Sequence, residues 1–273
     1  MATSQFADIN GAGKHVRIEY QWVGSADTTR PLIVFLHEGL GSVAMWKDFP
    51  QRLCEASNYR GLVYSRPGYG KSTPRAQDES WQPDFMHRQA FEVLPALLKA
   101  LNIDTAVQKP WLFGHSDGGS IALLFAAKYP MNTAGTIVLA PHILVEEISI
   151  SSIEKAKIAY KKTDLRSKLS RFHDDVDSAF WGWNDIWLSP AFRHWNLTQA
   201  IKTITSSLLA VQGLDDEYGT LEQIHGIKRV LPDAQLLELP KCGHSPHRDQ
   251  PDVLIQACTV FLSGLSALIS PHP

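Results

Sequence analysis

Short apolar runs alternate with longer amphipathic segments along most of this 273-residue chain. Continuous or alternating apolar runs predict strands, and apolar positions three or four residues apart predict helices. The predicted strands lie near 16–22, 31–36, 61–64, 111–113, 136–139, 208–211 and 235–239. The predicted helices cover about 43–56, 85–101, 120–128, 221–231 and 253–268, and Pro95 should kink or break the second of them. This alternation predicts an α/β fold whose mainly parallel, doubly wound sheet is covered by helices on both faces.

The alternation stops between residues 141 and 198, where the chain becomes helical and charged and then densely aromatic. Half of the eight tryptophans lie in this stretch. We therefore expect a core domain formed by 1–141 and 199–273, with a helical cap at 142–198. Most of the aromatic rings should hold the cap together, and one to three should reach a pocket. Leu40, His142, Trp183 and Trp187 are the candidates for binding a substrate there.

Residues 114–119 read Gly-His-Ser-Asp-Gly-Gly, between a predicted strand and a predicted helix. A serine on so sharp a turn is the arrangement of a nucleophile elbow, which needs small flanking residues. The backbone N–H of Asp117 and the positive end of the following helix would point at the same space. The alternative is that Ser116 is an ordinary N-cap residue.

A base and an acid follow Ser116 in the order that an elbow serine requires. His244 comes after the predicted strand 235–239, and Asp215 and Asp216 come directly after the strand 208–211 and Gly213. The carboxyl ends of strands are where open α/β sheets place their ligands. Three suitable side chains in this order favour catalysis over chance.

These motifs together resemble the α/β-hydrolase family, in its capped serine hydrolase and esterase branch, over nearly the whole chain. Further matches are the loop 37–42, which is similar to the family's oxyanion loop, the turn 64–72, and the loops 212–220 and 242–251. The resemblance implies that Ser116 is the nucleophile, His244 the general base and Asp216 the acid, because the acid usually falls three residues after the glycine. Asp215 is the alternative. It also implies that the backbone N–H groups of Gly39 and Asp117 form the oxyanion hole.

Two residues depart from the family pattern. Glu38 stands where a glycine is common, and we expect its side chain to turn into solvent or to pair with a nearby arginine, with an orientation into the pocket as the alternative. Ser65 stands where the family more often has an aspartate, so the turn loses a charge. Among the other histidines, we expect His115 to pack beneath the elbow, His37 to anchor the oxyanion loop, and His247 to be a surface residue or to lie behind the triad.

The resemblance implies a hydrolase that cleaves an ester or a similar carbonyl compound through an acyl-enzyme, without a cofactor. A carbon–carbon bond hydrolase of the meta-cleavage type is an alternative, although Ser245 stands where those enzymes often have a tryptophan after the histidine. A non-catalytic small-molecule receptor on the same fold is a second alternative. Ser116 argues against the relatives that use an aspartate nucleophile.

The composition limits the classes of molecule that the chain is expected to bind. The formal net charge of −2 and the absence of a basic stripe argue against nucleic acid as a partner. The three scattered cysteines suggest reduced thiols, no histidine or cysteine spacing suggests a metal, and we see no leader or membrane span. The expectation is a cytoplasmic enzyme that acts on a small, partly apolar molecule.

Overall fold

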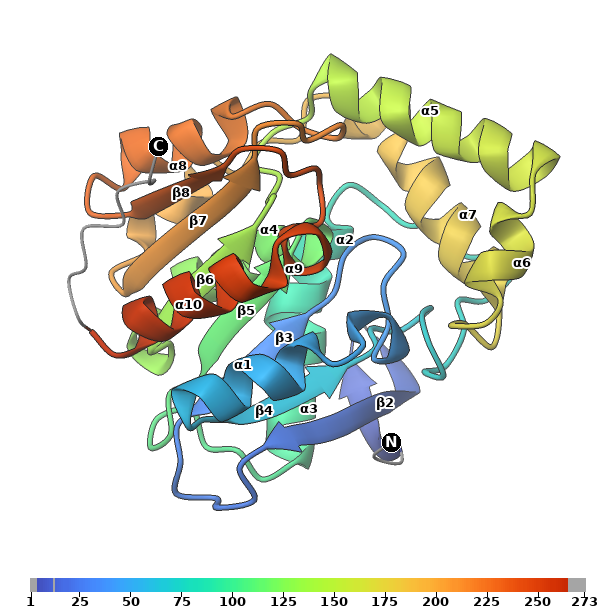
Figure 1. Cartoon of the computed structure of the whole chain (residues 1–273). Helices are drawn as coiled ribbons and strands as arrows, with labels where there is room; N and C mark the ends of the chain where they lie inside the picture. The colour runs from blue at the N-terminus through green and yellow to red at the C-terminus, as the bar shows by residue number, and fades with distance from the viewer. Residues whose placement is uncertain (1–3, 12, 265–273) are drawn as a thin grey trace.

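The computed structural model describes residues 4–11 and 13–264, which form one eight-stranded sheet flanked by helices (Figure 1). The strand order is β1-β2-β4-β3-β5-β6-β7-β8. The β1–β2 and β2–β4 pairs are antiparallel, and every pair from β4 to β8 is parallel. The strands are β1 Gln5–Gly11, β2 Lys14–Gly24, β3 Leu32–Leu36, β4 Arg60–Tyr64, β5 Trp111–His115, β6 Gly135–Leu139, β7 Ser207–Gly213 and β8 Gln235–Leu239. The predicted doubly wound, mainly parallel sheet is confirmed.

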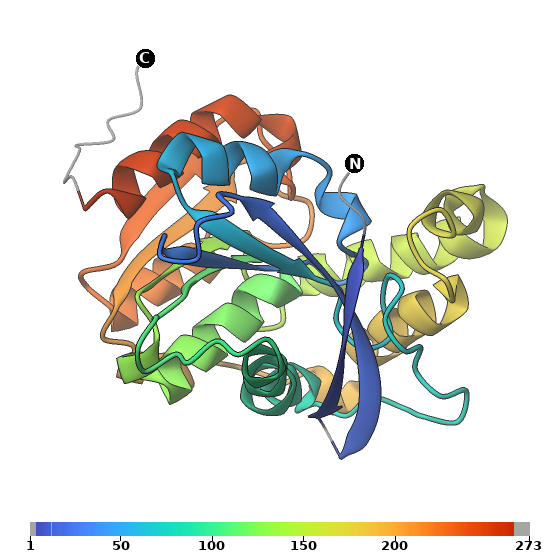
Figure 2. The same ribbon diagram turned by 90° about the horizontal axis from the view of Figure 1, so that it is seen from below.

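Helices cover both faces of the sheet, as Figure 2 shows with α1 and α10 above it and α4 below. In β3, Ile33 and Phe35 pack toward α1 and α10, while the other three residues pack toward α3 and α4. All five residues of this strand are buried, which explains its uninterrupted apolar sequence. The helices on the two faces are α1 Phe49–Ser57, α3 Leu94–Ala100, α4 Asp117–Lys128, α8 Glu222–Val230 and α10 Pro251–Leu262.

The sequence patterns missed β1 and the short helix α9, and they merged other elements. Most of β1 is exposed, with Ile9 and Gly11 its only buried residues, so it carries little hydrophobic signal. The expected helix 43–56 is a 3₁₀ turn, η1 (Ala44–Trp46), followed by α1, because Lys47 takes a positive φ of 54° between them. The four-residue helix α9 (Pro246–Asp249) was not predicted, and residues 265–268 of the last predicted helix lie outside the described residues.

The expected break at Pro95 is present. A π-helical turn, η2 (Gln89–Val93), separates α2 (Phe85–Arg88) from α3, in which Pro95 occupies the first turn. Proline has no N–H to donate and its ring displaces the carbonyl four residues earlier, so the chain changes its hydrogen-bond register there.

The segment between β6 and β7, which we call the insertion, contains α5 Glu147–Lys162, α6 Leu165–Leu169 and α7 Val176–Trp187, with 3₁₀ turns at η4 Pro190–Phe192 and η5 Ala200–Thr203. These three helices project from one end of the sheet (Figure 1). An isolated bridge between Leu144 and Asn196 joins the two ends of the insertion. Inside it, the rings of Tyr160 and Phe180 stack with centroids 3.7 Å apart. Aromatic packing thus holds the insertion together, as expected for most of its rings.

A buried carboxylate from a neighbouring strand supports the turn after β4. Ser65 Oγ donates to Glu19 Oε2 at 2.7 Å and accepts from the Val43 N–H at 2.9 Å. The Lys71 N–H donates to the same Glu19 oxygen at 2.9 Å. Glu19 lies on β2 and is 2% exposed. The charge that Ser65 does not carry is therefore supplied by Glu19.

This arrangement predicts that Glu19→Met lowers the free energy of unfolding by about 1–3 kcal/mol, because the Ser65 O–H and the Lys71 N–H lose a buried acceptor. Glu19→Gln keeps one acceptor oxygen and should lose less. Chemical denaturation measures both, with Glu154→Met on the exposed side of α5 as a control. Equal stability of Glu19→Met and the control would contradict this role.

Candidate active site

Ser116 occupies a strained turn between β5 and α4. Its φ of 53° and ψ of −121° are unfavourable for a residue with a side chain. A Cβ on Gly114 would lie 2.3 Å from the Gly118 oxygen, and a Cβ on Gly118 would lie 2.0 Å from the Leu36 oxygen. Ser116 Oγ makes no capping hydrogen bond to α4, unlike an ordinary N-cap residue. The turn holds the hydroxyl away from the helix that follows it.

The loops after β7 and β8 bring Asp216 and His244 together. Asp216 Oδ1 accepts from His244 Nδ1 at 2.8 Å and from the Tyr218 N–H at 2.8 Å. Gln212 Nε2 donates to Asp216 Oδ2 at 3.1 Å. Burial would raise the pKa of Asp216, but the hydrogen bond and charge of His244 and the Tyr218 N–H hold it below its usual value. The aspartate is therefore an anion that fixes the His244 tautomer with the proton on Nδ1.

The structure pairs His244 with Asp216 and leaves Asp215 exposed. The Asp215 N–H donates to the Cys242 oxygen at 2.9 Å, which holds the two loops together. A Cβ on Gly213 would lie 2.0 Å from the same Cys242 oxygen, so the loops approach closely at this point. Of the two candidate acids, only Asp216 contacts the histidine.

Three hydrogen bonds hold the loop that carries His244. His115 Nε2 donates to the His244 carbonyl at 2.7 Å. The His244 N–H donates to Glu217 Oε2 at 3.1 Å, and the Gly243 N–H donates to Asp249 Oδ2 at 2.9 Å. His115 thus lies beneath the elbow, where the sequence placed it, and supports the imidazole from behind.

Ser116 and His244 open into one cavity of about 190 Å³ between the carboxyl end of the sheet and the insertion. The four residues proposed from the sequence for substrate binding all line it, as do Gly39 and Asp117. Sequence reasoning missed other lining residues. Ser245 and Tyr218 lie within two residues of the triad positions, but nothing in the sequence singles out the rest, which are Met45, Ile153, Leu169 and Arg248.

Gly39 sits where a side chain could not fit. A Cβ there would lie 2.2 Å from Trp183 Nε1. Its N–H has no acceptor among the described residues, and the Asp117 N–H is in the first turn of α4, where helical N–H groups have no partner within the helix. Both N–H groups are thus available to a ligand of the cavity.

Glu38 differs in part from the expectation. Its Oε1 lies 3.3 Å from Arg248 Nη2, so it pairs with an arginine as expected, but it faces the cavity and not solvent. Its Oε2 lies 3.5 Å from His115 Nδ1. Burial would raise the pKa of Glu38, but His115 and Arg248 hold it well below its usual range. The cavity therefore contains a carboxylate near the candidate oxyanion loop.

Asp117 connects the elbow to the insertion. It is fully buried, and its Oδ1 accepts from Trp187 Nε1 at 3.1 Å. Burial raises the pKa of Asp117 to about 6, against the opposing effect of the Arg66 charge. A tryptophan of α7 thereby contacts the residue next to Ser116.

His142 and His247 are both buried, so of the two positions expected for His247 the one at the surface is wrong, and the one behind the triad is found. His142 faces the cavity, with its ring 5.7 Å from that of His244. His247 packs between Trp46 and His115, at ring distances of 4.9 and 4.8 Å. Burial lowers the pKa of His142 to about 3 and the pKa of His247 well below its usual value, so both are neutral in the folded protein.

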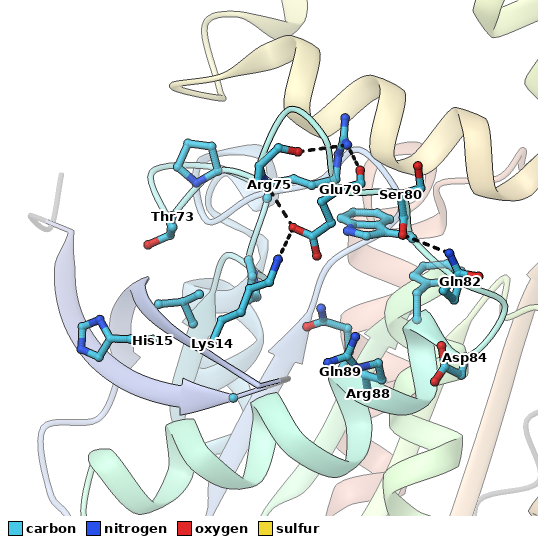
Figure 3. Close-up of a pocket in the computed structure, with 18 residues that line it drawn as sticks. Lys14, His15, Thr73, Arg75, Glu79, Ser80, Gln82, Asp84, Arg88 and Gln89 are labelled. Carbon is cyan, nitrogen blue, oxygen red and sulfur yellow. Dashed lines mark hydrogen bonds and ion pairs between the residues drawn. The ribbon is translucent and has the colours of Figure 1, made fainter.

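A second cavity of about 250 Å³ lies between the β1–β2 hairpin and the segment 73–89, and it contains none of the triad residues (Figure 3). Lys14 and Glu79 form an ion pair across it.

Within residues 4–11 and 13–264, no group of three or more His, Cys, Asp and Glu side chains could hold a metal. No helix of this described part is long and apolar enough to cross a bilayer.

The fold and the site together define the class of this protein, which is a hydrolase. The chain combines an open α/β sheet, a strained serine, an Asp–His pair and a cavity at the carboxyl end of the sheet. A profile of the alpha/beta hydrolase family matches residues 33–257, and the chain belongs to that family. It is 27% identical to the 2-hydroxy-6-oxo-6-phenylhexa-2,4-dienoate hydrolase of Burkholderia cepacia, and the alignment covers 96% of this chain and 97% of the relative. It is 26% identical, over the same shares, to the 2-hydroxy-6-oxononadienedioate/2-hydroxy-6-oxononatrienedioate hydrolase of Comamonas testosteroni. The structure is similar to that of a thermophilic esterase from Thermogutta terrifontis, with a TM-score of 0.72, 19% identity and coverage of 97% and 100% of the two chains.

The neutral, buried His247 predicts an acid-sensitive fold. Its pKa is lower in the folded protein than the value of about 6.5 in the unfolded chain, so the unfolded state binds the extra proton as the pH falls below about 6.5. Each such histidine costs about 1.4 kcal/mol of stability per pH unit below that value. His247→Leu should reduce the slope of unfolding free energy against pH between about 6 and 4 by nearly this amount.

Denaturant unfolding at several pH values measures this slope. His194→Leu, at an exposed position, is the control and should leave the slope unchanged. Parallel curves for His247→Leu and the wild type would show that His247 takes up no proton on unfolding.

Proposed function

We propose that the protein is a serine hydrolase that cleaves an ester or a similar carbonyl compound by acyl transfer to water. The observation that supports this most directly is the 2.8 Å contact between His244 Nδ1 and Asp216 Oδ1, beside a cavity that Ser116 and His244 share. Nδ1 carries a proton and donates a hydrogen bond to Asp216, so Nε2 has a free lone pair. That nitrogen is the base that an elbow serine requires.

In the proposed reaction, Ser116 Oγ attacks the substrate carbonyl carbon while its proton passes to His244 Nε2. The Gly39 and Asp117 N–H groups bind the oxygen that becomes negative. Collapse of the tetrahedral intermediate breaks the bond to the leaving group, which takes the proton from His244. Water then attacks the acyl-enzyme in the same way and releases the acid and free Ser116. No cofactor takes part.

We propose that residues 142–198, which form most of the insertion, act as a cap over a core domain of 1–141 and 199–273. Its Ile153, Leu169, Trp183 and Trp187 supply the apolar side of the cavity, together with Leu40 of the core. A cavity of about 190 Å³ with these walls fits a small, partly apolar acyl group. An anionic acyl group would meet the Glu38 carboxylate.

Carbon–carbon bond hydrolysis is the second candidate, favoured by one observation. The two curated relatives described above, which match almost end to end, carry the names of oxo-dienoate hydrolases. The same serine attack on a ketone would serve this reaction, with a carbon leaving group in place of an alcohol. Ser245, which lines the cavity, stands where those enzymes often have a tryptophan.

We expect the wild type to hydrolyse p-nitrophenyl esters and Ser116→Ala to lose at least about 10³-fold in kcat while keeping the fold, because the nucleophile is absent. A series from acetate to laurate, with circular dichroism of both proteins, tests this. Short chains should react fastest because the cavity is small. A Ser116→Ala protein with full activity would contradict the assignment.

Two further reagents, a dienoate substrate and a covalent probe, separate the candidate functions. Turnover of a 2-hydroxy-6-oxo-dienoate, with slow ester hydrolysis, would favour the carbon–carbon reaction. Labelling of Ser116 by a fluorophosphonate without turnover of either substrate would indicate a narrower substrate. Neither turnover nor labelling would favour a small-molecule receptor.

Asp216→Asn should lower kcat by about 10²–10⁴-fold, because an amide does not stabilise the imidazolium and permits the wrong tautomer. Asp215→Asn, one residue away and exposed, is the matched control and should stay within about threefold of the wild type. Steady-state kinetics of the two variants decide between the carboxylates. The reverse order would assign the acid to Asp215.

A further inference from the structure

Arg66, in the turn after β4, is fully buried beside the candidate oxyanion loop. It takes no direct part in the proposed reaction. A buried guanidinium costs free energy unless its donors find partners. Its carbon Cζ lies 4.7 Å from the centre of the Tyr69 ring. The shortest hydrogen bond of its side chain, however, goes to the backbone of the loop that carries Gly39.

Arg66 Nη2 donates to the carbonyl oxygen of Glu38 at 2.8 Å. His37 Nε2 accepts the Arg66 backbone N–H at 3.0 Å, so the proton of this imidazole is on Nδ1. Nδ1 in turn lies 2.7 Å from the same Glu38 oxygen and donates to it. The Gly41 N–H also donates to this oxygen, at 3.1 Å. One backbone donor and two side-chain donors, one from Arg66 and one from His37, therefore meet on one carbonyl oxygen.

The Glu38 carbonyl and the Gly39 N–H belong to the same planar peptide unit. A force that fixes the carbonyl oxygen also fixes the direction of the N–H on the other side of the plane. Hydrogen bonds accepted by a carbonyl also polarise its peptide and strengthen the donor at the other end. Arg66 and His37 thus act on the N–H that would bind the oxyanion.

The guanidinium also faces the residue that carries the other proposed donor. Arg66 Nη2 lies 4.0 Å from Asp117 Oδ2, and both side chains are 1% exposed. Arg66 Nη1 and Asp117 Oδ2 have no hydrogen-bond partner among the described residues, so the direct hydrogen bond to Glu38 is the more specific contact. One positive charge lies near the two residues whose N–H groups would meet the developing negative charge.

We infer that Arg66 is a positioning residue of the oxyanion hole, which orients and polarises the Gly39 N–H through the Glu38 carbonyl. The inference rests on the proposed serine hydrolase function. It predicts an effect on transition-state stabilisation and not on substrate binding, because Arg66 does not line the cavity.

The test compares Arg66→Met, Arg66→Lys and the wild type on a p-nitrophenyl ester and on the matching thionoester. Sulfur accepts hydrogen bonds weakly, so the ester is favoured to the extent that the oxyanion hole contributes. Arg66→Met should lower kcat on the ester by about 10–100-fold with KM within about threefold, and should lower the ester-to-thionoester ratio of kcat/KM by about tenfold. Arg66→Lys, which keeps the charge but not the fork, should lie between Arg66→Met and the wild type.

Arg52→Met, which breaks only an exposed pair with Asp252, is the control and should match the wild type. A loss of activity on both substrates with an unchanged ratio would mean that Arg66 only supports the fold, and would overturn the inference. If Arg66→Met does not fold, an unchanged ratio in Arg66→Lys overturns it equally. Turnover that survives Ser116→Ala would instead overturn the proposed function, and the inference with it.

Discussion

The contact between Gly118 and the carbonyl oxygen of Leu36 is the constraint on which the candidate site depends. A Cβ at Gly118 would lie 2.0 Å from this oxygen, so α4 can approach β3 only through a glycine. This approach sets the start of α4 and, with Gly114, forces Ser116 into its unfavourable backbone conformation. Because Leu36 is the last residue of β3, the same contact also fixes the start of the loop to Gly39. One backbone contact therefore positions the serine and the start of each segment that carries a proposed oxyanion donor.

Buried polar groups connect this backbone frame to the insertion. Trp187 of α7 donates to Asp117, and His173, just before α7, lies 2.9 Å from the Leu40 oxygen and accepts the Gly70 N–H. These contacts tie the insertion to the elbow and to the candidate oxyanion loop. A shift of the insertion would thus change the hydrogen bonding around Asp117. A movement of the insertion, which supplies the apolar side of the cavity, would therefore also affect the polar groups beside Ser116.

The sequence predicted the parts of the site that depend on local geometry. The elbow needs glycines at fixed spacing, and the acid and the base follow strand ends, so Ser116, the Asp215–Asp216 pair and His244 stand out in a single chain. The role of Arg66 could not be predicted, because its partner carbonyl lies 28 residues away and backbone atoms leave no trace in sequence. The position of His247 stayed open between the surface and the space behind the triad, because the sequence does not show that α9 turns this side chain into the core. β1 was missed because an exposed edge strand has no hydrophobic pattern.

The proposed site specifies the attack on a carbonyl carbon more firmly than it specifies the leaving group. Serine attack, proton transfer to His244 and stabilisation of an oxyanion are the same for an ester and for a ketone. The difference arises after the tetrahedral intermediate, when an alkoxide takes one proton from the imidazolium but a carbanion must be stabilised by conjugation and protonated at carbon. The side chains that line the cavity beside the triad, among them Ser245 and the Glu38–Arg248 pair, are in a position to contact such a fragment. Under the proposed function, the choice between the two reactions therefore depends on side chains that line the cavity beside the triad and not on the triad itself.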